Sequence, residues 1–168
     1  MYVTPATLMQ RFGALELAQV ATLENRPVVS PEVFSRVVLG ESTAGDDPTE
    51  VADANDALAR VQRAITDTDE LIDSYIANRY PLPLASVPGI LETYAGDIVR
   101  YRLHKDFAES GQHPVQVRYR DALRFLGLLA EGKVTLGASD PVSPSGGGER
   151  VQYAAPTAVF SREALADY

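Results

Sequence analysis

The 168-residue chain contains no cysteine and no tryptophan. Without thiols it has neither disulfide bonds nor thiolate zinc sites. No apolar run approaches the roughly 20 residues that a membrane-spanning helix requires. The segment MYVTPATLMQRFG also lacks the basic start and long apolar stretch of a signal peptide. We therefore expect a protein made in the cytoplasm, with no membrane partner, that gains stability from its own core or from oligomerisation.

Basic residues are scarce, and the acidic ones are unevenly distributed. The net charge is −8, and the segment 41–73 carries all of it, because ten acids there accompany only Arg60 and Arg63. This distribution argues against a nucleic-acid-binding protein, which would have a basic face. Two interpretations stay open: a solvated loop and helix face, or a surface that repels passing DNA. The candidates for an acidic channel wall or rim are Asp67, Asp69, Glu70 and Asp73.

No pattern in the sequence indicates catalysis. The stretch 127–134 nearly has the spacing of a phosphate-binding loop, but Val134 stands where Ser or Thr must bind magnesium, and the stretch closes a predicted helix. His104 and His113 lack HExxH spacing, and the acids near Asp69 lack the glycine of a calcium loop. No GxSxG elbow is present, so only a Ser-His-Asp triad assembled from distant residues is left open. We expect no enzymatic activity, no cofactor and no metal.

Apolar spacing predicts helices over most of the first 132 residues. Thr4 before Pro5 is a typical helix start, and short helices are predicted up to Phe12 and over 14–22. Long helices are predicted over about 50–79, 87–108 and 115–131, the first capped by Thr49 or Asp53 and the last followed by a Gly132 cap. Residues 24–53 read as an irregular insert, with one helical turn over 32–39. The predicted fold class is all-α: a small helical bundle of three long helices plus short N-terminal helices, with an extended C-terminal tail.

A proline-rich corner separates the first two long helices. Each proline fixes φ and lacks a backbone N–H, so neither helix can continue through it. Leucines between the prolines keep the corner apolar, and we expect it to be structural and buried against the third helix. The corner residues are Pro81, Leu82, Pro83, Leu84 and Pro88.

The composition changes after Gly132 and divides the chain into a helical domain, 1–132, and a linker with an extended docking tail, 133–168. The run DPVSPSGGG at 140–148 is typical of a flexible linker. The segment after it regains aromatic and aliphatic residues, and such a segment generally docks onto another surface. The expected docking residues are Tyr153, Phe160, Ser161 (a cap for a terminal helical turn), Leu165 and Tyr168.

The third quarter of the chain has some basic character. Its cations have two interpretations: intramolecular helix pairing, or an acceptor for the acidic helix of a neighbouring subunit. These residues are Arg100, Arg102, Lys105, Arg118, Arg120 and Arg124.

Four stretches of the chain resemble the Mu-like phage neck-protein family, a group of small helical head-completion or head–tail connector proteins. The stretch IDSYIANRYPLPL with its following DIVRYRL helix is the most specific. The insert at 24–53 departs from the family by its greater length. The four stretches are MYVTPATLMQRFGALELAQ, DELIDSYIANRYPLPLASVPGILETYAGDIVRYRLH, RYRDALRFLGLLAEGKVTLG and FSREAL.

The resemblance implies a structural head–tail connector, or adaptor, in the virion neck between capsid and tail. Such a protein forms a homo-oligomeric ring of about twelve subunits below the portal and extends the DNA channel. The implied partners are the phage portal protein, a stopper or tail-completion protein, and double-stranded DNA that passes without specific contacts. The alternative is a non-virion cytosolic helical adaptor module that binds one protein partner through its C-terminal tail.

Overall fold

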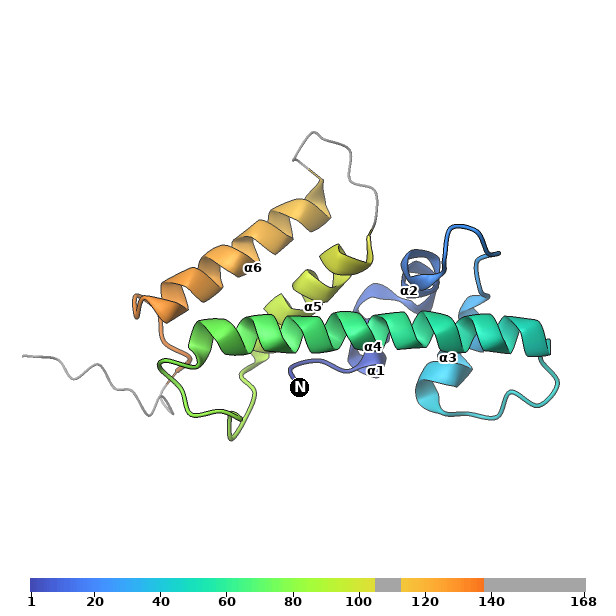
Figure 1. Ribbon diagram of the computed structural model, residues 1–168, viewed down its shortest axis with the longest axis horizontal. Helices are drawn as coiled ribbons and strands as arrows, with labels where there is room; N and C mark the ends of the chain where they lie inside the picture. Colours follow the sequence, from blue (N-terminus) through green and yellow to red (C-terminus); the bar gives the residue numbers. More distant parts are fainter. Residues whose placement is uncertain (105–112, 138–168) are drawn as a thin grey trace, which may run out of the picture.

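The computed structural model describes residues 1–104 and 113–137. This part of the chain forms six α-helices and no strand, which confirms the predicted all-α class (Figure 1). None of these helices is both long and apolar enough to cross a membrane. The expected docking tail and Lys105 lie outside the described residues. The helices are α1 (Pro5–Phe12), α2 (Ala14–Ala21), α3 (Pro31–Leu39), α4 (Pro48–Ile76), α5 (Gly89–Leu103) and α6 (Pro114–Ala130).

Four of the helices begin with the same local chemistry, a capping side chain followed by proline at the first helical position. The cap accepts a hydrogen bond from a backbone N–H that has no partner within the helix. Proline fits the next position because its missing N–H is not needed there. The pairs are Thr4–Pro5, Ser30–Pro31, Asp47–Pro48 and His113–Pro114.

The insert predicted over 24–53, with a helical turn over 32–39, is more regular than expected in two places. α3 occupies nine residues of it and buries Val33 and Phe34 in the core. α4 begins at Pro48, inside the predicted loop, and its cap is Asp47 instead of Thr49 or Asp53. In both places the signal was a polar residue before a proline, which marks a helix start as well as a turn.

α4 is the central helix of the fold. It has 29 residues and is therefore about 44 Å long. Figure 1 shows α1–α3 along one half of α4 and α5 and α6 along the other. The buried face of α4 carries small residues in its first half and isoleucines in its second, and the hydroxyl of the buried Thr68 donates to the Ala64 carbonyl at 2.7 Å. This face consists of Ala54, Ala57, Val61, Ala64, Ile65, Thr68, Ile72 and Ile76.

α5 packs against both α4 and α6 and is the most enclosed helix. Buried apolar side chains on α5 meet Leu126 and Leu129 of α6 in the common core. The rings of Tyr101 and Tyr119 stack at 3.9 Å between centroids and 5° between planes, which adds a second contact between the two helices. The buried apolar residues of α5 are Leu91, Ala95, Ile98, Val99 and Leu103.

After α6 the chain returns to the end of α4. The Arg79 guanidinium donates to the Leu129 carbonyl at 3.1 Å, and the same carbonyl also accepts from the Gly132 N–H at the end of α6. The guanidinium lies so close to Gly132 that a Cβ at this position would displace it. The Leu136 N–H donates to the hydroxyl of Tyr80 at 3.3 Å. The described chain therefore ends beside Tyr80, where the corner after α4 begins.

Candidate interaction surfaces

Two acidic side chains in the second half of α4 hold the start of the chain. Asp69 accepts a hydrogen bond from the Tyr2 N–H at 2.9 Å, and its other oxygen lies 3.6 Å from the Met1 amino group. Asp73 accepts a hydrogen bond from the Tyr2 hydroxyl. Burial of the Tyr2 hydroxyl, followed by this bond and the charges of both carboxylates, raises its pKa above the usual value. Asp69 and Asp73 are therefore anchors within the fold.

The other two acids proposed for a channel wall or rim are more open to solvent. Asp67 lies 3.6 Å from the Arg102 guanidinium, and its side chain is 52% exposed. Glu70 is exposed one turn further along α4. Of the four residues singled out in the sequence, Asp67 and Glu70 alone are exposed.

The remaining acids of the segment 41–73 mostly have intramolecular partners too. Some of these contacts fasten the loop before α3 to the first half of α4, and another fastens the loop after α3 to α3 itself. Their partners are 10 to 30 residues away in the sequence, so the acidic composition gave no sign of them. The contacts are Arg26 with Asp53 and Asp56, Arg36 with Asp46, and the Ser30 N–H with Glu50.

A buried ion pair joins α1 to α5. Asp97 is only 5% exposed, and its carboxylate accepts a hydrogen bond from Arg11 at 2.9 Å. Arg11 also donates to the Thr93 carbonyl at 2.6 Å. Gly96 makes room for the guanidinium, because a Cβ there would lie 2.8 Å from it. The sequence analysis missed this pair, which spans 86 positions.

A second ion pair joins α2 to α5. Arg100 donates to both oxygens of Glu16, and its guanidinium lies 4.8 Å from the centre of the Phe12 ring. The His104 ring lies 3.6 Å from the same carboxylate. The interpretation of the basic residues as intramolecular pairing partners is therefore confirmed for Arg100, and likewise for Arg102 through Asp67.

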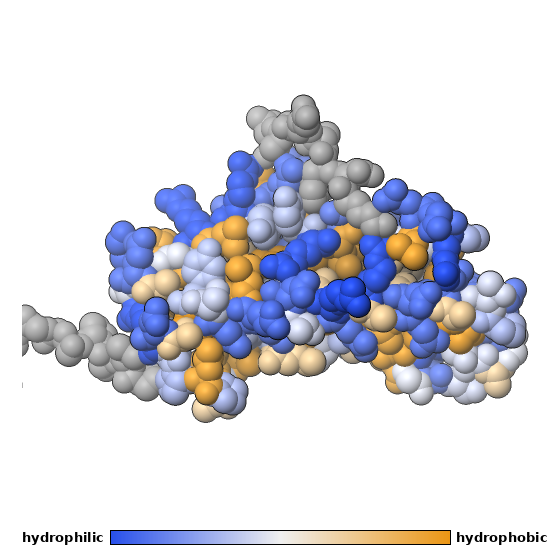
Figure 2. All heavy atoms as spheres, in the orientation of Figure 1, coloured by the Kyte–Doolittle hydropathy of each residue, from blue (hydrophilic) through white to orange (hydrophobic). Residues whose placement is uncertain are grey.

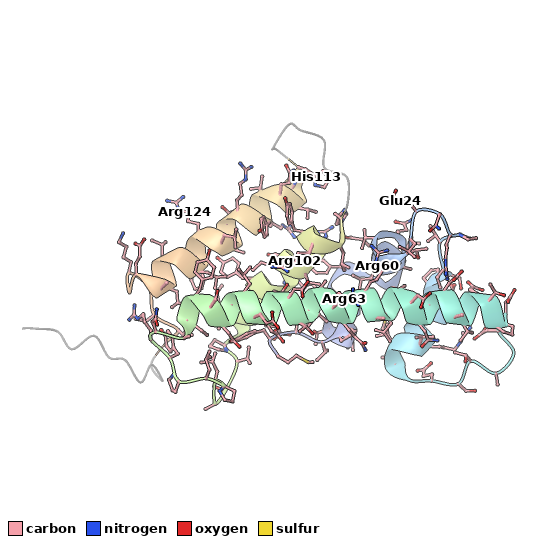
Figure 3. All side chains as sticks on the ribbon, in the orientation of Figure 1. Glu24, Arg60, Arg63, Arg102, His113 and Arg124 are labelled. Carbon is pink, nitrogen blue, oxygen red and sulfur yellow. The ribbon has the colours of Figure 1, made fainter. Side chains whose placement is uncertain are left out.

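An arginine surface is defined here by Arg63, Arg102 and Arg124, which belong to α4, α5 and α6. Figure 3 labels one arginine on each of these helices, with Arg124 projecting from the outer side of α6. All three residues are exposed. Figure 2 shows the face in view as largely hydrophilic along α4. The surface can attract an acidic partner.

The expectation that the corner is buried against the third helix was wrong for its first part. Pro81, Leu82 and Pro83 are exposed, Leu82 by 37%. The apolar side of α6 is already used on α4 and α5, and a connecting loop generally runs over the surface. Leu84 is partly buried and packs on the core, and Pro88 is the cap position of α5.

Exposed apolar residues border two hollows on the described part of the chain. The corner surface, defined as Met1, Val87 and Ile90, has residues that are 78%, 39% and 41% exposed. It borders an open hollow of about 280 Å³ that both Met1 and Val87 line. The second hollow is called the α2–α3 groove after the loop between these helices, and it lies between that loop, the end of α2 and the end of α5. Its volume is about 310 Å³, and its exposed apolar residues are Leu23 and Val28.

No group of histidines and acids that could hold a metal ion occurs within residues 1–104 and 113–137. The phosphate-loop-like stretch at 127–134 covers the C-terminal end of α6, as predicted. The expected docking residues lie outside the described part of the chain: Tyr153, Phe160, Ser161, Leu165 and Tyr168.

Comparison with known proteins gives a consistent result. The chain is 43% identical over 82 residues to the Mu-like prophage FluMu protein gp36 of Haemophilus influenzae, covering 49% of this chain and 56% of that protein. The chain thus spans about half the length of that relative. It is 31% identical over 110 residues to gene product J of Escherichia phage Mu, covering 65% of this chain and 74% of that protein. The sequence model of the family described as Bacteriophage Mu, Gp36 matches residues 2–153. The chain therefore belongs to the Bacteriophage Mu Gp36 family of phage proteins.

Proposed function

We propose that this protein is the head–tail connector, or adaptor, of a Mu-like phage. In this role about twelve copies form a ring in the virion neck below the portal. Family membership indicates a phage structural or morphogenesis protein, and the connector role goes one step further. It agrees with the family resemblance of the corner and the helix after it.

The observation that carries the proposal is that each subunit exposes charges of both signs on different helices. The arginine surface involves α6 and the half of α4 beside it, whereas Glu32 and Glu41 are exposed on and just after α3. Figure 1 shows α3 and α6 on different halves of α4. A closed ring requires two different, complementary patches on each subunit. Charge complementarity of this kind fixes the register between neighbours.

The remaining partners follow from the same role. The portal protein would bind one end of the ring, and a stopper or tail-completion protein the other. Double-stranded DNA would pass through the channel, where carboxylates repel phosphate groups. We expect Glu70, and Asp67 beside Arg102, to take this role, because Asp69 and Asp73 are bonded to Tyr2.

Electron microscopy of the purified full chain, alone and mixed with the portal protein of the same phage, tests the proposal. We expect rings of uniform order, formed by the chain alone or on the portal vertex. The charge-reversal variant Arg124→Glu should weaken the ring, while Arg124→Lys, the matched control, should retain it. Particles that stay monomeric in both samples, with no density added to the portal, would contradict the connector role.

A further inference from the structure

The end of the described chain lies close to the corner surface. The Leu136 N–H is bonded to the hydroxyl of Tyr80, and Tyr80 is 3% exposed and packed in the core. Val87 is seven positions after Tyr80, so their Cα atoms are at most about 24 Å apart, whatever path the loop takes. The described chain therefore ends beside the residue from which the corner starts.

The segment that follows has the length and composition to cover this surface. Residues 138–150 are rich in glycine, serine and proline, and thirteen such residues typically span about 18–22 Å. Beyond them, residues 151–168 regain the apolar side chains Val151, Tyr153, Phe160 and Leu165. A linker of this length can therefore bring the apolar part of the tail to the corner surface.

The α2–α3 groove is less accessible to the same segment. Arg26 lines the groove and pairs with Asp56 on the first half of α4. Twenty residues of α4 separate Asp56 from Ile76, which places the groove about 30 Å along the helix from the end of the described chain. The typical reach of residues 138–150 is shorter than this distance, whereas Val87 lies at most about 24 Å from Tyr80.

We propose that residues 151–168 dock in cis on the corner surface formed by Met1, Val87 and Ile90 in the unassembled protein. A short linker holds a tethered segment at an effective concentration in the millimolar range, so the chain's own surface competes well against that of another copy. Docking shields exposed apolar residues of the corner and the tail together until assembly. The inference concerns the free chain and does not depend on the connector role.

Tryptophan fluorescence tests the proposal, because the chain contains no tryptophan of its own. In full-length Phe160→Trp protein we expect emission blue-shifted from that of a peptide of residues 151–168 with the same substitution. Quenching by acrylamide should be several-fold weaker than in the peptide. Both properties should persist throughout a dilution series, since docking in cis does not depend on concentration.

Surface variants locate the docking site. Val87→Ser combined with Ile90→Ser should return the emission to that of the peptide, with the helical circular-dichroism signal unchanged because both side chains are exposed. Leu23→Ser combined with Val28→Ser, the matched control in the α2–α3 groove, should leave the emission blue-shifted. The proposal would be overturned if the full-length Phe160→Trp protein emitted like the peptide, or if its blue shift disappeared on dilution. It would also be overturned if only the substitutions in the α2–α3 groove, Leu23→Ser with Val28→Ser, removed the blue shift.

Discussion

The ion pair between Arg11 and Asp97 offers a quantitative test of how α1 is attached to α5. Asp97→Ala would leave the Arg11 guanidinium without its carboxylate, and Arg11→Met would leave Asp97, 7% exposed at its side chain, without its cation. Removing one partner of a buried pair typically costs about 3–5 kcal/mol. Because the Arg11 side chain is 32% exposed, water screens part of this effect.

We therefore expect Asp97→Ala to lower the free energy of unfolding by about 3 kcal/mol, the low end of that range. In a domain of this size the loss corresponds to a decrease in Tm of roughly 6–12 °C. The double variant Arg11→Met with Asp97→Ala contains no unpaired buried charge. Its loss of unfolding free energy should therefore be smaller than the sum of the two single losses, with a coupling energy of at least about 1 kcal/mol. Urea unfolding followed by circular dichroism measures all three values.

Arg118→Met serves as the control for removing an arginine, because Arg118 is exposed on α6. Its effect should stay within about 0.5 kcal/mol. Two outcomes would refute the view that this pair fastens α1 to α5. One is that the free-energy losses of the single variants simply add up in the double variant, and the other is an Asp97→Ala variant as stable as the control.

Four further predictions follow from the structure. Leu82→Asp should leave the protein folded and soluble, because the side chain is 37% exposed, whereas Leu126→Asp in the core should prevent folding, as expression and circular dichroism would show; equal effects would contradict the burial difference. Tyr2→Phe should cost about 1–2 kcal/mol at neutral pH by removing a hydrogen bond to a carboxylate. Since the folded state raises the Tyr2 pKa, the wild type should lose this stabilisation as the pH rises above about 10, the value in the unfolded chain. In urea titrations at alkaline pH, the unfolding free energy of Tyr2→Phe should therefore decline less than that of the wild type. The same pH dependence in both proteins would show that the hydroxyl is not held as described. Deleting residues 150–168 should preserve the helical signal but abolish assembly on the portal, giving heads without tails; a truncated protein that still joins tails would make the segment dispensable. Glu70→Gln should leave stability unchanged and slightly increase salt-dependent retention of DNA by assembled rings; unaltered retention would make this acid merely solubilising.

The helices were largely predictable because their signals are local. Thr4 and Pro5 mark the start of α1 in the sequence and in the structure, and apolar spacing located α4, α5 and α6 to within a few residues. α3 was underestimated even though Ser30–Pro31 repeats the pattern of Thr4–Pro5. A consistent reading of that pattern would have found the helix.

The surfaces were less predictable because exposure and pairing depend on residues far away in the sequence. The apolar run around Leu82 indicated burial, but whether it is buried depends on which side of α6 remains free. The acidic residues looked like a charged face, yet Asp69 and Asp73 bond to Tyr2 across 67 and 71 positions. The i, i+4 spacing of these two acids on one face was the only hint that they act together.

The contact between Arg11 and Asp97 also constrains how the protein is made. The two residues are 86 positions apart, so at synthesis rates of 5–20 residues per second α1 must wait about 4 to 17 s for its partner helix to be translated. During this time the apolar side of α1 can be covered only by the elements that are made earlier, α2, α3 and α4. The nascent chain is therefore open to chaperones or to premature contacts at its N-terminal end, and the closing of this end is a late step of folding on the ribosome.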